Sequence, residues 1–225
     1  MLLSLTACGS TSAAAPQSTL ETPAETPAPP KENTVEPPAA VMENPVAEEP
    51  AESGILVINF SRMGEQNNVG VIEKGNTAIV AEMIAEATGA DLYEILPADD
   101  HYPMTYKELT DVALQEQREG ARPAYVDNVP SLDGYDTIFI GAPVWWGDWP
   151  MILYTFFENT PLSGKTLIPF STHAGSGLSG FDRSLAAAYP DCTVTKGLAV
   201  AGTDAQNDPD LVQQSVSRWL MELGF

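Results

Sequence analysis

Apolar residues form short, nearly continuous runs along residues 55–225, with segments of helical period between them. The runs ILVINF at 55–60 and DTIFIGA at 136–142 are rich in β-branched residues and are typical of strands buried on both faces. Three further strands are predicted by the runs at 91–95, 166–172 and 193–201. The pattern therefore predicts five strands.

Helical spacing returns between the strands. From Thr77 the apolar residues recur at helical spacing up to Gly89, and Asp208-Pro209 provides a cap and first turn for a last helix that Gly224 ends. Further helices are predicted at 105–119, 150–157 and 181–189. Because strands and helices alternate, the sequence predicts an α/β fold in which a parallel sheet carries helices on both faces.

The first 54 residues have a different composition from the rest of the chain. They contain 9 of the 19 prolines, eight acidic residues and a single base, Lys31. Such a segment lacks the apolar content that would offset the entropy of ordering it. We expect a disordered tether at residues 9–54 and a folded domain at residues 55–225.

Charge and hydropathy exclude several partners. The formal net charge is −21, of which −7 lies in the first 54 residues and −14 in the remainder. Nucleic acid is excluded as a general ligand because the nine bases of the folded part are dispersed, whereas binding to phosphates needs clustered cations. No run of 18 or more apolar residues occurs, so no membrane-spanning helix is predicted.

The amino terminus suggests a lipid anchor. Residues 1–8 end in Leu5-Thr6-Ala7-Cys8, which resembles a bacterial lipobox, and two or more acyl chains on Cys8 would anchor the protein durably. A secretory signal has a basic start and about 7 to 15 apolar residues, so we expect the signal peptide to begin upstream of Met1. The prediction is an extracytoplasmic domain that is lipid-anchored to the bacterial cell membrane. The alternative is a leader that ends by chance in a thiol.

Candidate binding residues follow the first strand. In a sheet of this kind, a ligand lies beyond the carboxyl ends of the strands. Ser61-Arg62 follow the first strand, and Gly75-Asn76-Thr77 open the next helix twelve residues later. Hydroxyls, an amide and unbonded backbone N–H groups at a helix N-terminus can hold a phosphate without a net positive charge. Ser, Asn and Thr are also ordinary helix caps, and the motif taken alone favours that interpretation.

Two later strands also end in distinctive loops. Pro143-Val144-Trp145-Trp146-Gly147 and the nearby Trp149 place three of the four tryptophans in one loop, which predicts a stacking platform for a flat ligand. For Trp149, packing under the following helix is the better interpretation. The next strand ends in Thr172-His173-Ala174-Gly175, whose small residues let the backbone approach a ligand edge.

Taken together, these motifs resemble those of the flavodoxin family, in the branch with a Trp-Trp-Gly flavin loop, over residues 55–225. The resemblance implies a flavodoxin-like three-layer sandwich, a five-stranded parallel sheet in the order 2-1-3-4-5 and one noncovalent FMN. It implies that the FMN phosphate is held by Ser61, Asn76 and Thr77, with Arg62 and Gly75 in the same motif. It also implies that the isoalloxazine is bordered by Pro143, Val144, Trp145, Trp146 and Gly147 on one side and by Thr172, His173 and Gly175 on the other.

The chain departs from the family in the first loop. Flavodoxins usually have one residue between the pair that matches Ser61-Arg62 and the Gly-x-Thr, whereas this chain has twelve, Met63 to Lys74. We expect this insertion either to fold over the flavin or to present a surface to a partner. Its length leaves open whether Arg62 reaches the phosphate.

The sequence fits other cofactors and reactions less well than it fits FMN binding. Residues 175–180 read G-x-G-x-x-G with Asp204 further on, which taken literally indicates NAD, but only one strand follows where a dinucleotide fold needs two. No G-x-S-x-G elbow is present, and the two histidines, His101 and His173, predict no transition-metal site. His173 is better explained as a hydrogen-bonding loop residue than as a base.

The sequence therefore predicts an FMN-binding, flavodoxin-like electron-transfer protein whose redox partner is an unidentified protein. Indole stacking, the nearby Asp148 and the negative charge of the domain favour a low potential. Two alternatives remain: an FMN-dependent NAD(P)H/quinone oxidoreductase, and a flavin-free ligand-binding lipoprotein.

Overall fold

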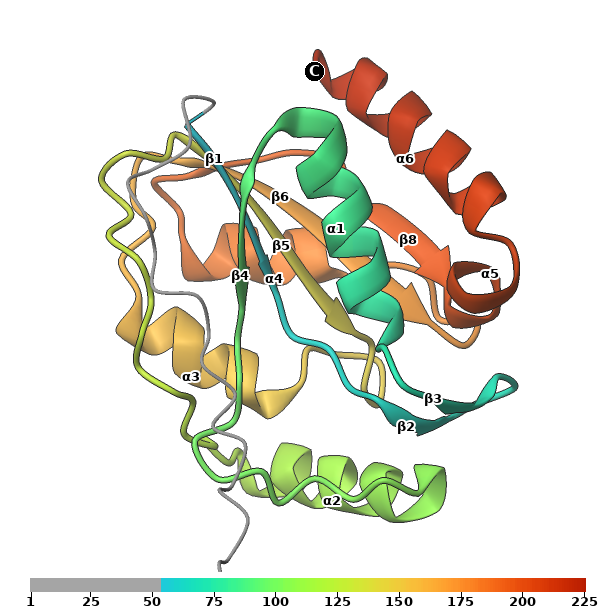
Figure 1. The fold of residues 1–225 in the computed structure, drawn as a ribbon. Coiled ribbons are helices and arrows are strands. Elements are labelled where there is room, and N and C mark those ends of the chain that lie inside the picture. The colour runs from blue at the N-terminus through green and yellow to red at the C-terminus, as the bar shows by residue number, and fades with distance from the viewer. Residues whose placement is uncertain (1–53) are drawn as a thin grey trace, which may run out of the picture. The chain divides into compact units, whose positions relative to one another are not determined.

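The structure is a computed structural model that describes residues 54–225, so the predicted lipobox with Cys8 and nearly all of the tether lie outside the described residues. Its main sheet has the order β4-β1-β5-β6-β7, with β8 also paired to β6, and every pairing in it is parallel (Figure 1). The predicted order 2-1-3-4-5 is confirmed. The strands are β1 (Ile55–Asn59), β4 (Asp91–Glu94), β5 (Thr137–Pro143), β6 (Thr166–His173), β7 (Thr193–Val194) and β8 (Leu198–Ala201).

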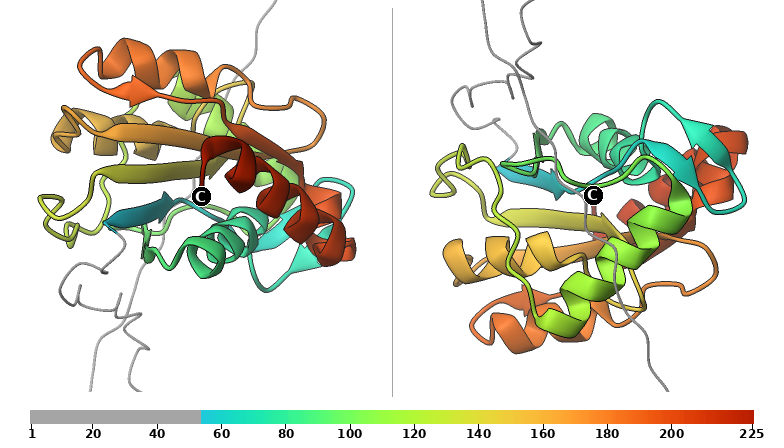
Figure 2. Two further views of the ribbon diagram at one scale, coloured as in Figure 1. Left: turned by 90° about the horizontal axis from the view of Figure 1, so that it is seen from above. Right: turned by 90° about the horizontal axis from the view of Figure 1, so that it is seen from below.

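Helices cover both faces of this sheet, as the two views of Figure 2 show. Along β1, Leu56 and Ile58 face the core under α3 and α4, while Val57 faces the core under α1 and α6. Such two-sided burial explains the unbroken apolar run of this strand. The helices are α1 (Asn76–Thr88), α2 (Tyr106–Glu119), α3 (Met151–Asn159), α4 (Phe181–Ala188), α5 (Gly202–Asn207) and α6 (Pro209–Leu223), of which α5 was not predicted.

The single strand predicted at 193–201 is split into β7 and β8, and Pro169 of β6 gives the reason. Leu167 accepts a hydrogen bond from the backbone N–H of Thr195 at 3.1 Å, so Pro169, two residues on, faces the same neighbouring strand. Proline has no N–H to donate there. The ladder consequently breaks between the pairs Leu167–Val194 and Phe170–Leu198.

The insertion at residues 63–74 folds as a hairpin that the sequence did not predict. Its strands, β2 (Gly64–Gln66) and β3 (Gly70–Ile72), pair antiparallel. Asn68 and Gly70 have positive φ angles of 58° and 95°, and these two residues tolerate that conformation best. The hairpin lies close to the carboxyl ends of the main strands, beside α2 (Figure 1).

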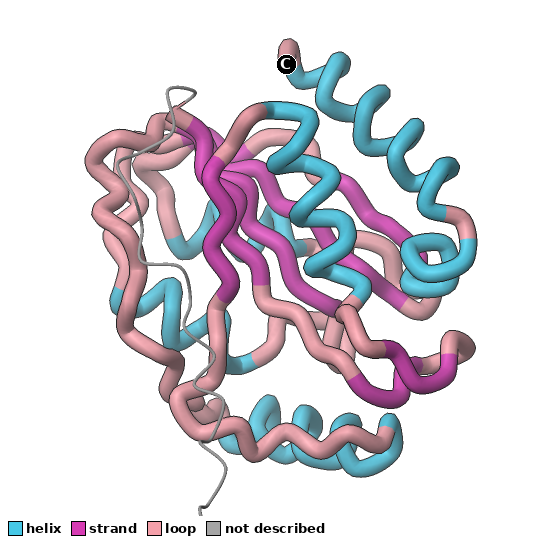
Figure 3. The backbone as a smooth tube through the Cα atoms, viewed as in Figure 1, coloured by secondary structure: helices cyan, strands magenta, loops and turns pink. Residues whose placement is uncertain are grey.

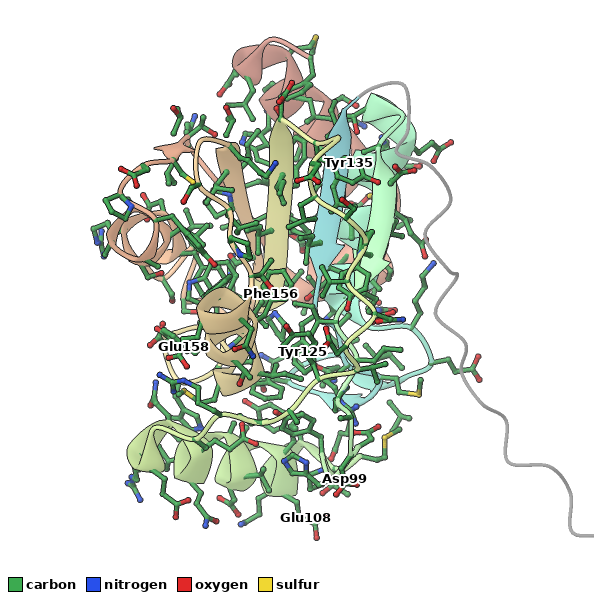
Figure 4. All side chains as sticks on the ribbon, turned by 90° about the vertical axis from the view of Figure 1, so that its left-hand side faces the viewer. Asp99, Glu108, Tyr125, Tyr135, Phe156 and Glu158 are labelled. Carbon is green, nitrogen blue, oxygen red and sulfur yellow. The ribbon has the colours of Figure 1, made fainter. Side chains whose placement is uncertain are left out.

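Helix α2 lies beyond the carboxyl ends of the strands and not on a face of the sheet, as Figures 1 and 2 show. The long loops on either side of it (Figure 3) come together at a neck, where Ala98 N–H donates to Ala124 O at 2.9 Å and Val126 N–H donates to Leu96 O at 2.8 Å. Tyr125 packs edge-on against Phe156 of α3, with ring centroids 5.8 Å apart (Figure 4). The segment that contains α2 thus leaves the sheet and returns to it at one place, where these hydrogen bonds hold its two ends together.

Within residues 54–225, none of the helices is both long and apolar enough to cross a membrane.

Candidate functional site

A cleft of about 220 Å³ opens at the carboxyl ends of the strands, where the ligand was predicted to lie. The first strand loop, the Trp loop after β5 and the loop after β6 all contribute to its lining, as do the hairpin and α2. The lining residues are Gln66, Asn67, Asn76, Tyr106, Leu109, Thr110, Ala113, Pro143, Val144, Trp145, Trp146, Thr172, His173, Ala174 and Gly202.

The Trp loop is built on a tight turn. Trp145 and Asp148 exchange two backbone hydrogen bonds, of 2.9 and 3.1 Å, and the two residues between them, Trp146 and Gly147, have φ angles of 50° and 80°. Two successive positive φ angles are typical of a type I′ turn, which favours glycine at the second position. The turn presents Trp146 at the surface, with 54% of the residue exposed.

The three tryptophans of this loop have different environments. Trp145 lines the cleft and packs edge-on against Phe60 and Tyr102, with ring centroids 5.6 and 5.2 Å apart. Trp149 is buried as predicted, and it contacts the following helix edge-on through Phe157 of α3 at 5.4 Å, but its stacking partner is Phe181 of α4 at 3.5 Å. Trp145 and Trp146 are therefore the indoles that a ligand in the cleft can contact.

Asp148 points toward α3. Its carboxylate accepts hydrogen bonds from Trp149 N–H at 2.8 Å and from the Tyr154 hydroxyl at 2.9 Å. Burial and the neighbouring carboxylate raise the pKa of Tyr154 to about 12, so the phenol keeps its proton at neutral pH. The pair joins the end of the Trp turn to the first turns of α3.

The N-terminus of α1 forms a close-fitting cradle with the end of β1. Ser61 Oγ accepts the N–H of Ala78 at 3.0 Å, so Ser61 caps α1. This agrees with the interpretation of the motif as a helix cap. A Cβ atom at Gly75 would lie 2.1 Å from Ser61 Oγ, so only glycine fits. The amides of Asn76 and Thr77 precede the first bond within the helix, from Ile79 N–H to Gly75 O.

The carboxyl ends of β6 and β8 close this cradle from the other side. The hydroxyls of Thr77 and Thr172, 95 positions apart in sequence, are 2.8 Å from each other, and both side chains are buried. Gly202 approaches Asn76 so closely that a Cβ atom there would lie 2.5 Å from the Asn76 amide nitrogen. These contacts bring the first, fourth and fifth predicted strand ends together.

Arg62 points away from the cradle. Its guanidinium donates to both carboxylate oxygens of Asp100, at 2.8 and 2.9 Å, and to the carbonyl of Tyr102 at 3.1 Å, and it lies over the Tyr102 ring. The cleft lining does not include Arg62. The Arg62 side chain is thus joined to the loop before α2, although its backbone lies against Gly75.

His173 lies at the mouth of the cleft as a neutral hydrogen-bonding group. Its Nδ1 accepts the N–H of Gly175 at 2.9 Å, which leaves the ring proton on Nε2. Burial lowers the pKa of His173, and this effect outweighs the opposing influence of Asp204. The geometry agrees with the predicted role as a loop residue and adds a neutral N–H donor beside the cleft.

A buried carboxylate holds α2 against the loop that precedes it. Glu116 of α2 accepts from the Tyr102 hydroxyl at 3.2 Å and lies 3.0 Å from His101 Nε2, while His101 Nδ1 lies 2.9 Å from the carbonyl of Asp99. The hydrogen bond with Glu116 is the largest cause that raises the pKa of His101. Both ring nitrogens therefore face acceptors, and the charged imidazolium is favoured.

Part of this site could not be found from the sequence. The predicted loops do converge, and Asn76, Pro143, Val144, Trp145, Trp146, Thr172 and His173 line the cleft, with Ser61, Gly75, Thr77, Gly147 and Gly175 in the same loops. The contribution of α2 was missed, whereas a contribution of the insertion at residues 63–74 to the site was one of the two alternatives expected for it. No motif in the loop that follows the strand predicted at 91–95 pointed to the cleft. Residues 54–225 contain no group of three or more metal-ligating side chains.

The comparison with known proteins agrees with this geometry. A family profile described as flavodoxin, Flavodoxin_4, matches residues 70–219. The fold and the cleft define a flavodoxin-like α/β protein with its ligand site at the carboxyl edge of the sheet. The chain belongs to the flavodoxin family. No curated protein matches it significantly.

The solved structures similar to this chain include three flavoproteins. A candidate flavoprotein from Bacteroides eggerthii is 30% identical, with a TM-score of 0.58 and coverage of 76% of this chain and 98% of that one. One from Bacteroides uniformis is 31% identical, with a TM-score of 0.57 and coverage of 72% and 97%. A flavoprotein from Lactobacillus acidophilus, solved in complex with FMN, is 23% identical, with a TM-score of 0.50 and coverage of 68% and 95%.

Proposed function

We propose that the domain binds one FMN in the cleft and acts in electron transfer. The observation that carries this proposal is the convergence of two unlike surfaces on one cleft: Trp145 and Trp146 line it with their indoles, and Asn76 lines it at the N-terminus of α1, between Gly75 and Thr77 of the cradle. A flat aromatic ring fits the first and a phosphate fits the second. Membership of the flavodoxin family and the FMN complex of the Lactobacillus acidophilus relative support the assignment.

The residues of the cradle fit a phosphate dianion. Ser61 Oγ accepts the N–H of Ala78, so its own hydroxyl hydrogen remains available to a ligand oxygen. The backbone amides of Asn76 and Thr77 add N–H donors, and the α1 dipole favours negative charge at this end. This cradle requires no cation, which is consistent with the engagement of Arg62 elsewhere.

At the other end, the protein controls the surroundings of the ring. FMN supplies the redox chemistry when it is bound. Trp145 and Trp146 offer stacking surfaces, and His173 offers a neutral N–H rather than a cation. Stacking and an acidic domain both disfavour added negative charge on the ring, so a low reduction potential is expected.

The colour of the purified protein tests this proposal. We expect absorbance near 450 nm from a chromophore that heat releases and that behaves as FMN. A colourless protein that remains colourless after incubation with FMN would leave the flavin-free binding protein as the better account. Turnover of NAD(P)H with a quinone would favour an FMN-dependent oxidoreductase over an electron carrier.

We further propose that the domain is tethered outside the cytoplasmic membrane through a lipidated Cys8. The lipobox-like Leu5-Thr6-Ala7-Cys8 and the Pro- and Glu-rich segment that follows it support this proposal. The redox partner is then a protein exposed on the same side.

Replacement of Cys8 tests the tether. In a bacterial host that processes lipoproteins, Cys8→Ser is expected to move the protein from the detergent phase to the aqueous phase and to abolish processing that is sensitive to globomycin. Cys192→Ser is the matched control, because it removes the other cysteine of the chain. A Cys8→Ser protein that still partitions with membranes would refute the lipid anchor.

A further inference from the structure

The hairpin and α2 meet at a single acidic side chain. One carboxylate oxygen of Glu65, in β2, accepts the backbone N–H of Tyr106, the first residue of α2, at 2.9 Å. The two residues are 41 positions apart in sequence. In the same place Glu65 N–H donates to Met104 O at 2.8 Å, so β2 bonds to the chain immediately before the helix through both its backbone and this side chain.

Glu65 substitutes for the local cap of α2. Thr105 occupies the N-cap position but, within the described residues, makes no side-chain bond to the first amides of the helix, and its hydroxyl donates to Glu108. The first N–H groups of a helix need partners from outside it, and a carboxylate also interacts favourably with the helix dipole. The insertion therefore supplies the hydrogen-bond acceptor that the residues next to the start of α2 do not provide.

Close packing fixes the hairpin in this position. Gly64 is buried, has a φ of 97°, and lies so near the chain that a Cβ atom there would be 2.7 Å from Met104 O. On the other flank, Gln66 donates to the carbonyl of Arg62 at 3.4 Å. A shift of the hairpin relative to the chain before α2 would break the contact between Gly64 and Met104.

The other side of α2 holds the Trp loop. The indole N–H of Trp146 donates to the carbonyl of Thr110 at 2.8 Å, and the side-chain amide of Gln117 donates to the carbonyl of Trp146 at 3.4 Å. Tyr106, Leu109 and Ala113, on the same helix, line the cleft. The position of α2 thus affects both the width of the cleft and the orientation of an indole that lines it.

We propose that Glu65 is a positioning residue of the cleft: by capping α2 from the insertion, it holds that helix as a wall of the ligand site and fixes Trp146 through the Thr110 carbonyl. The insertion at residues 63–74 is then a structural support for the site, and its role is neither a cover lying flat on the ligand nor a cation donor. The part of this proposal that concerns Trp146 and the ligand rests on the proposed binding of FMN.

Hydrogen exchange of the full-length protein without FMN tests the cap. Glu65→Ala is expected to reduce protection of the amides at 106–110 on the order of tenfold, because the first turn of α2 loses its acceptor. Protection in β6 and α6 should not change. Glu73→Ala is the matched control, since it removes an exposed acid from the same insertion. Equal exchange at 106–110 in the wild type and Glu65→Ala would overturn the assignment.

A conservative variant distinguishes the loss of this hydrogen bond from a general loss of stability. Glu65→Gln keeps a side-chain oxygen that can accept the Tyr106 N–H, so it is expected to restore most of the protection that Glu65→Ala loses. A Glu65→Gln protein as labile as Glu65→Ala would contradict the proposed hydrogen bond. This readout needs no flavin, so it remains decisive even if the wild type fails to bind FMN, an outcome that would refute the proposed function instead.

The rate of FMN release tests the connection to the cleft. Glu65→Ala and Trp146→Phe are each expected to accelerate release several-fold, and the double variant is expected to release FMN little faster than Trp146→Phe alone. Such non-additivity is the signature of two residues that act through one contact. Fully additive effects would show that the cap does not act through Trp146 and would overturn that step.

Discussion

Gly75→Ala is expected to weaken FMN binding by roughly 100-fold or more, about 2.7 kcal/mol. Its added Cβ atom would lie 2.1 Å from Ser61 Oγ and 2.7 Å from the carbonyl of Arg62, so the loop before α1 must move. The φ of Gly75, −66°, suits alanine, and the effect therefore comes from lack of space rather than from backbone strain. Titration of the apoprotein with FMN, followed by tryptophan quenching, measures the loss.

Gly89→Ala serves as the control for this variant. Gly89 ends α1 with a φ of 66°, and a Cβ atom there would meet no other atom within 4 Å. This change is expected to cost about 1 kcal/mol of folding stability and to leave FMN affinity unchanged. A Gly75→Ala protein that binds FMN as tightly as the wild type would show that the cradle at α1 does not hold the phosphate.

Trp149→Ala is expected to lower the free energy of unfolding by about 3 to 5 kcal/mol. The Trp149 ring is buried, stacks on Phe181 at 3.5 Å, and donates its indole N–H to Ser184 Oγ at 2.6 Å. Its removal leaves a cavity between the Trp loop and α4, and a loss of this size is a large part of the stability of an ordinary domain. Urea unfolding measures the change.

Trp146→Ala provides the comparison, because it removes the same side chain from the same loop at a position that is 54% exposed. Its effect on unfolding is expected to stay below about 1 kcal/mol, while FMN affinity falls about tenfold through lost stacking. Equal losses of stability in the two variants would contradict the separation of the loop into a packed indole and a ligand-facing indole.

Local pattern was sufficient to predict most of the sheet and its helices. The two-sided burial of β1 follows from its unbroken apolar run, and the last helix begins and ends where its cap and glycine predict: Asp208 accepts the N–H of Leu211 at 3.1 Å, and Gly224 has a φ of 96°. The break between β7 and β8 could not be predicted from their own residues. It depends on Pro169, which becomes their neighbour only when β6 is placed beside them.

The candidate site likewise has one part that local sequence patterns predict and another that depends on contacts between distant segments. Residues near the carboxyl ends of strands, such as Thr77 at the start of α1 and Thr172 at the end of β6, come together because parallel strands end at one edge. The wall formed by the hairpin and α2 depends on contacts between distant segments, chiefly Glu65 with Tyr106 and the neck at Ala98 and Ala124. No local period or motif marks such contacts, which is why the sequence left the role of the insertion open.

A comparison of FMN with riboflavin tests the central claim most directly. If the indoles hold the ring and the α1 cradle holds the phosphate of the same molecule, the apoprotein will bind FMN at one equivalent with quenching of its tryptophan fluorescence. Riboflavin, which lacks the phosphate, will then bind much more weakly. Equal affinity for the two compounds, or no quenching by either, would contradict the account.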